Sequence, residues 1–107
     1  MDKAHESQPF PLKDSIAYQE GSVVSREIAR KKTGTLTLFA FDQGQGLSEH
    51  TTPFDATILC VDGKLEAKVD GKPVTVREGE MLIMPANKPH SITALRPFKM
   101  LLIMIRA

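Results

Sequence analysis

Short apolar or alternating runs, each ended by turn residues, recur about every eight to twelve residues from Ser22 onward. This spacing is typical of a β-sandwich or β-barrel and leaves little room for helices. The clearest unit is residues 64–77, in which apolar and polar side chains alternate on both sides of Asp70 and Gly71. An Asp-Gly pair adopts the two positive φ angles of a type I′ turn, so these residues are predicted to form a tight β-hairpin. The pattern as a whole predicts an all-β, antiparallel fold.

The length of the chain allows a single domain. Its 107 residues suffice for one hydrophobic core but not for two. Residues 1–21 have irregularly placed apolar side chains and two prolines, Pro9 and Pro11, so they are predicted to form an extended N-terminal arm. Residues 22–107 are predicted to form the β-domain.

Two further runs, residues 81–84 and 99–105, are apolar at consecutive positions. A strand of this composition has both of its faces covered. One face is expected to line the interior of a barrel, and the other to contact a second sheet or a second subunit, because an exposed apolar face promotes aggregation. We therefore expect a homodimer, with the N-terminal arm contributing to its interface.

The charge balance excludes two classes of partner. Lys and Arg number 14 and Asp and Glu number 13, so no overall positive field would attract nucleic acid or an anionic membrane. No stretch approaches the ~18 apolar residues of a membrane span, and the first residues lack the apolar segment of a signal peptide. The single cysteine, Cys60, allows no internal disulfide and lies in an apolar run. These features predict a cytoplasmic protein in which Cys60 is a small buried apolar residue.

Two glycine-bounded segments carry the histidines with the most informative spacing. Residues 46–63 begin and end with glycine and contain a His-Thr-Thr tripeptide, and residues 79–90 follow the pattern Gly-x5-Pro-x4-His. Together they resemble the two motifs of the cupin family, a glycine followed by His-x-His, glutamate and glycine, and then Gly-x5-Pro-x-Gly-x2-His. The resemblance spans residues 35–105. Asn87 stands where the second motif usually has glycine, and asparagine is the ordinary residue that best tolerates a positive φ.

The resemblance implies an antiparallel jelly-roll barrel whose motif histidines point inward onto a divalent metal (zinc, nickel, iron or manganese) beside a ligand pocket. Metal sites of the family generally use three histidines and one glutamate. Here His50 and His90 occupy ligand positions, whereas Thr52 replaces a histidine and Ala56 replaces the glutamate. Strand periodicity predicts that His50, Thr52 and Ala56 share one face and that Asp55 points away from it. His50 and His90 are therefore the candidate metal ligands.

Three functions remain open on these residues. In the first, which the reduced ligand set favours, the protein binds a small organic ligand through His50, Thr52 and His90 without catalysis. In the second, His50, His90 and water hold a metal for oxygenase or isomerase chemistry. In the third, the protein is a structural or regulatory dimer with a packed barrel core. No catalytic residue is assigned. Four methionines suit either a soft apolar pocket or a packed core: Met81, Met84, Met100 and Met104.

Overall fold

The computed structural model of the protein describes residues 6–106, so residues 1–5 of the expected arm and Ala107 lie outside the description. No helix within residues 6–106 is long and apolar enough to cross a membrane. The secondary structure of this range consists of nine strands: β1 (Val23–Lys31), β2 (Gly34–Phe41), β3 (Gly46–His50), β4 (Ala56–Asp62), β5 (Lys64–Val69), β6 (Lys72–Arg77), β7 (Met81–Met84), β8 (His90–Thr93) and β9 (Phe98–Ile105).

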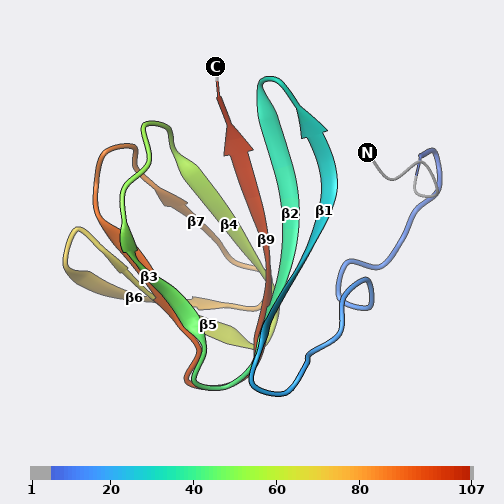
Figure 1. The fold of residues 1–107 in the computed structure, drawn as a ribbon, viewed down its shortest axis with the longest axis horizontal. Coiled ribbons are helices and arrows are strands. Elements are labelled where there is room, and N and C mark those ends of the chain that lie inside the picture. The colour runs from blue at the N-terminus through green and yellow to red at the C-terminus, as the bar shows by residue number, and fades with distance from the viewer. Residues whose placement is uncertain (1–5, 107) are drawn as a thin grey trace.

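The strands form two sheets (Figure 1). The five-stranded sheet has the order β1-β2-β9-β4-β7, and the four-stranded sheet has the order β3-β8-β5-β6. All neighbouring strands in both sheets are antiparallel. The chain repeatedly crosses from one sheet to the other, which is the arrangement of a jelly roll. The all-β, antiparallel prediction is confirmed.

The predicted hairpin is present as β5 and β6. Its register runs from Lys64 opposite Arg77 to Val69 opposite Lys72, which leaves Asp70 and Gly71 as the turn. Both turn residues have positive φ, 51° at Asp70 and 79° at Gly71, as a type I′ turn requires. The tight turn thus fixes which face of each strand points into the core.

The main hydrophobic core lies between the two sheets. Phe41 and Phe98 are completely buried, and their rings stack with centroids 4.6 Å apart. Met84 and Met100 are part of this core, so at these two positions the methionines fill the interior rather than line a hollow. Burying a large apolar side chain stabilises a fold by about 1.5–3 kcal/mol, which makes this cluster the main source of stability. The remaining buried members are Ala56, Ile58, Cys60, Leu65, Ala67, Val76, Ile92 and Ala94.

Cys60 is 1% exposed, within this core. Its thiol donates to the carbonyl oxygens of Asp62 and Gly63, with the sulfur 3.6 and 3.4 Å away. Burial raises the pKa of the thiol to about 11, so the thiol stays protonated at neutral pH. The prediction that Cys60 is a small buried apolar residue is confirmed.

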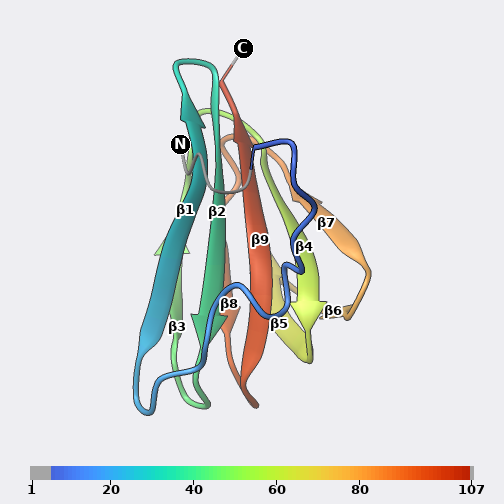
Figure 2. The ribbon, with the colours of Figure 1, turned by 90° about the vertical axis from the view of Figure 1, so that its right-hand side faces the viewer.

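A second apolar cluster covers part of the outer face of the five-stranded sheet. Ile16, from the segment that precedes β1, is only 8% exposed and packs with Leu38 of β2 and Leu101 of β9. Leu12 packs against the same cluster. Figure 2 shows this segment crossing the outside of the five-stranded sheet. The expected arm therefore covers its own chain's sheet over residues 12–16.

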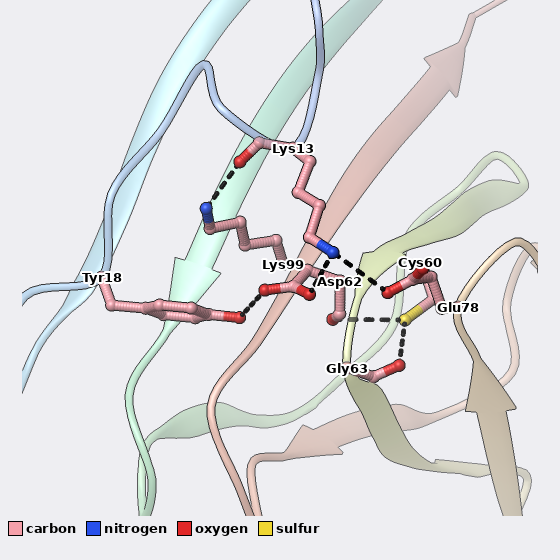
Figure 3. A network of polar contacts seen from close by, with 7 residues as sticks. All are labelled: Lys13, Tyr18, Cys60, Asp62, Gly63, Glu78 and Lys99. Carbon is pink, nitrogen blue, oxygen red and sulfur yellow. Dashed lines mark hydrogen bonds and ion pairs between the residues drawn. The ribbon is translucent and has the colours of Figure 1, made fainter.

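Polar contacts hold the same segment in place (Figure 3). The Tyr18 hydroxyl donates to Asp62 Oδ2 at 2.7 Å, and Lys13 Nζ lies 3.2 Å from Asp62 Oδ1. Lys99 Nζ donates to the Lys13 carbonyl oxygen at 2.5 Å and lies 5.0 Å from the centroid of the Tyr18 ring. Burial and the bond to Asp62 raise the pKa of Tyr18, and that bond lowers the pKa of Asp62. Polar contacts thus hold the segment on both sides of Ile16, at Lys13 and at Tyr18.

The rest of the outer face has no cover in the described residues. Met81 and Ile83 of β7 are 56% and 58% exposed, and Ile105 of β9 is 64% exposed. Thr57 of β4 pairs with both Ile83 and Ile103, so these side chains lie in one row across the outer face. The sequence prediction of doubly apolar strands holds here, but the described part of the chain leaves one apolar face open to solvent.

Candidate functional site

The two candidate histidines lie together at the junction of β3 and β8. His50 is the last residue of β3 and His90 the first of β8, and they are direct partners in the register of the four-stranded sheet. Their rings meet edge to face, with centroids 4.3 Å apart, and their Nε2 atoms are 3.1 Å apart. His50 is exposed, whereas His90 is 3% exposed. The pair therefore connects solvent to the interior of the barrel.

The hydrogen bonds of the pair determine its neutral tautomer. His50 Nδ1 lies 2.7 Å from the Ser48 carbonyl oxygen, which can only accept, so Nδ1 carries the proton. His50 Nε2 is then an acceptor and receives the Nε2–H of His90. In neutral His90 this leaves Nδ1 unprotonated, with a lone pair that can accept a hydrogen bond. That atom is buried and makes no hydrogen bond of good geometry with the described residues, although the Lys88 backbone lies near the ring.

The environment of His90 disfavours its charged form. Burial lowers the pKa of this imidazole, and the neighbouring charge of His50 lowers it further. The Lys88 backbone opposes the shift only weakly, because it is the smallest of the three influences. His90 is therefore neutral at pH 7 and acts as a hydrogen-bonding group rather than as a cation.

His50, Thr52 and Ala56 do not lie on one continuous strand, contrary to the premise of the sequence prediction. The strand ends at His50, and Ala56 begins β4 in the other sheet, where it is buried at 2% exposure. Thr52 lies in the loop between them, and its hydroxyl donates to the Phe54 carbonyl oxygen at 2.6 Å. The premise fails because period-two alternation holds only while a strand continues, and the chain changes sheets after residue 50.

Backbone hydrogen bonds join the two motif segments next to the histidines. Asn87 has a φ of 63°, as expected for an asparagine that replaces glycine, and its N–H donates to the Thr52 carbonyl oxygen at 2.8 Å. Asp55 Oδ1 accepts the N–H of Ala86 at 2.9 Å. Asp55 thus fixes the loop before β4 to the loop before β8. The sequence carries no signal for these bonds or for the Ser48 carbonyl, because they depend on backbone atoms.

The donor set does not fit a tightly held catalytic metal. Two nitrogens bound to one tetrahedral ion lie about 3.3 Å apart, so His50 and His90 could both reach one cation. Within residues 6–106, however, no cluster of three or more His, Cys, Asp or Glu side chains could hold a metal ion. Catalytic metals usually have three protein ligands. The described residues therefore supply too few ligands for such a metal.

Three hollows on the surface of residues 6–106 are lined by residues other than this pair. Their volumes are about 370, 440 and 470 Å³, and their lining residues belong to the outer face and to the loops. A ligand at the pair would therefore contact the exposed ring of His50 first.

Comparisons with known proteins agree with the arrangement of strands and motifs. The sequence model of a family described as "Cupin domain" matches residues 37–105. A solved protein of unknown function from Streptococcus pyogenes is 28% identical, with a TM-score of 0.89 over 94% of this chain and 89% of that chain. A cupin superfamily protein from Desulfitobacterium hafniense is also 28% identical, with a TM-score of 0.89 over 95% and 94%.

A cupin 2 conserved barrel domain protein from Leptotrichia buccalis is 39% identical, with a TM-score of 0.86. That match covers 90% of this chain but 47% of the Leptotrichia chain. No curated protein matches the sequence.

Proposed function

Because this chain belongs to the cupin family, we propose that it is a small-molecule-binding cupin domain with a reduced metal site, in which His50 and His90 recognise the ligand. The observation that carries the proposal is the direct contact between an exposed and a buried imidazole, with Nε2 atoms 3.1 Å apart. Thr52 contributes through its carbonyl oxygen, which positions the loop that contains Asn87.

The tautomer of the pair indicates the chemistry of the ligand. In the neutral pair one proton lies between the two Nε2 atoms, donated by His90. If His50 takes up one proton from solvent, both Nε2–H groups can donate to an oxygen acceptor placed between the rings. A carboxylate supplies such an acceptor and balances the added positive charge. We therefore infer that the ligand is a small organic acid and that its binding is accompanied by uptake of one proton.

The experiment uses metal-free protein and a panel of small monocarboxylic acids, from acetate to benzoate. Isothermal titration in buffers of different ionisation enthalpy reports affinity and proton uptake, and NMR of the labelled imidazoles reports which rings respond. We expect saturable binding with uptake of a proton and shifts at both His50 and His90. His50→Ala should weaken binding at least about tenfold, because hydrogen bonds to charged groups contribute about 1.5–3 kcal/mol. Glu49→Gln, at the exposed neighbouring position, is the matched control and should bind as wild type does.

Two results would overturn the proposal. If no acid of the panel binds saturably, the structural or regulatory dimer becomes the better interpretation, and the packed core around Phe41 and Phe98 already favours it as second candidate. If zinc or nickel binds in near-stoichiometric amount and resists a chelator, the metal-dependent enzyme replaces the binding domain. His90→Ala would then abolish metal binding.

We also propose that the protein is a homodimer that buries the open outer face of the five-stranded sheet. Ile105 lines two neighbouring hollows of that face, of about 370 and 440 Å³, and is itself 64% exposed. Lys31 lines the first hollow and Asp55 the second. A twofold axis would insert the Ile105 side chain of each copy into the partner's hollow and bring Lys31 near Asp55 of the second copy. In an isologous contact the same surface of both copies meets itself, so it must carry both the exposed Ile105 side chain and a hollow that receives it.

A further inference from the structure

A separate hollow of about 470 Å³ lies beyond the Thr93 end of β8, whereas His90 is at the other end of that strand. Three of the side chains that line it are positively charged at neutral pH. The lining residues are Gly63, Lys64, Arg77, Glu78, Arg96 and Pro97. No residue of the histidine pair takes part, so this hollow is independent of the proposed function.

Two features of the backbone bring the three cations together. Lys64 and Arg77 are direct partners at the open end of the β5–β6 hairpin. Gly63 has a φ of 72°, and a Cβ at this position would lie 2.8 Å from the Pro97 carbonyl oxygen. Only glycine permits this approach, which places the β4–β5 turn directly against the loop that carries Arg96.

The hollow carries a net positive charge, because three cationic residues line it against one carboxylate, that of Glu78. Like charges directly opposite each other destabilise a pair of strands, yet Lys64 and Arg77 occupy such positions. Within residues 6–106 no ion pair or side-chain hydrogen bond engages Lys64, Arg77 or Arg96. The nearby carboxylates have other partners. Glu78 Oε1 lies 3.7 Å from Lys13 Nζ, and Glu80 Oε1 accepts the backbone N–H of Arg77 at 2.8 Å.

We propose that this hollow binds a small oxyanion that carries at least two negative charges, either a phosphoryl group or a pair of carboxylates. Guanidinium groups bind both kinds of oxyanion through paired N–H donors, and Arg77 and Arg96 supply two such groups. The anion would relieve the repulsion between Lys64 and Arg77. The volume of the hollow lies within the range of about 300–1,000 Å³ that small-molecule sites occupy.

The test is titration of the protein with inorganic phosphate and, separately, with malonate, followed by amide chemical shifts at about 0.1 M ionic strength, where charges more than about 10 Å away are screened. We expect saturable binding of at least one probe, with shifts centred on Gly63 and Arg96. Arg77→Gln combined with Arg96→Gln should weaken binding at least about tenfold, because it removes two charge-assisted contacts. The matched control, Lys68→Gln combined with Lys72→Gln, removes the same net charge from the other end of the same hairpin and should retain the affinity within about twofold.

Each outcome bears on the proposal. Binding of phosphate alone assigns a phosphoryl ligand, and binding of malonate alone assigns a dicarboxylate. Failure of both probes to saturate overturns the proposal, as does an equal loss of affinity in the control, since only overall charge would then matter. If the double arginine variant does not fold, Arg96→Gln in the exposed loop replaces it and should weaken binding about threefold. His50→Ala should leave this binding unchanged, which separates this site from the histidine pair.

Discussion

At the scale of single residues, the surroundings of His90 alter its protonation close to neutral pH. Its pKa lies below the ordinary value of about 6.5 because of burial first and the charge of His50 second. Between the folded-state pKa and about pH 6.5, the unfolded chain binds more protons than the folded one. The contribution of His90 to the free energy of unfolding is therefore complete above about pH 6.5 and is lost as the pH falls toward the folded-state pKa.

We expect an NMR titration to place the pKa of His90 below that of histidine in the unfolded chain. His50→Gln should raise the pKa of His90 only part of the way toward the ordinary value, because it removes the neighbouring charge and leaves most of the burial. A His90 that titrates at or above the ordinary value would show that the ring is solvated. That result would also remove the argument for the neutral tautomer of the pair.

At the scale of elements, the segment before β1 acts as part of the core although it belongs to no strand. Ile16 is its apolar anchor, and exposed ion pairs such as that of Lys13 with Asp62 stabilise proteins only weakly. Ile16→Ala should therefore lower the free energy of unfolding by about 2 kcal/mol, toward the low end for a buried Ile→Ala change. The loss is limited because it cannot exceed the free energy with which the segment binds to the sheet.

Denaturant unfolding of the variant measures this loss. Leu95→Ala is the matched control, since it removes the same number of atoms from a side chain that is 62% exposed. We expect this control to change the free energy of unfolding by less than about 0.5 kcal/mol. Equal effects of the two substitutions would show that residues 12–16 do not pack on the sheet in solution.

At the scale of the whole molecule, the open apolar face decides the state of association. We expect light scattering at tens of micromolar protein to give the mass of a dimer. Ile83→Asp should convert the protein to a monomer, raising the dissociation constant at least about 100-fold, because it would bury an unpaired carboxylate in the contact. Leu95→Asp, at another exposed apolar position, should leave the dimer intact. A monomeric wild-type protein would refute the proposed interface.

Much of the fold could be predicted from local patterns. The hairpin followed from alternation around Asp70 and Gly71, because the turn depends only on the φ angles of two residues. The buried strands followed from consecutive apolar residues, as in β9. The two glycine-bounded motifs identified His50 and His90 as the residues of interest, and the structure places them in contact. Each of these predictions uses information within a few residues or within one spaced motif.

The tertiary structure alone decided the features that depend on where the chain changes direction. After His50 the chain leaves the four-stranded sheet, so Ala56 lies in the other sheet, and no local pattern marks that crossing. Docking of Ile16 on the outer face and the gathering of Lys64 and Arg96 around one hollow likewise join residues far apart in the chain. Such contacts depend on the relative placement of two sheets, which is determined by packing of the whole core, whereas turn and strand preferences act only between neighbouring residues.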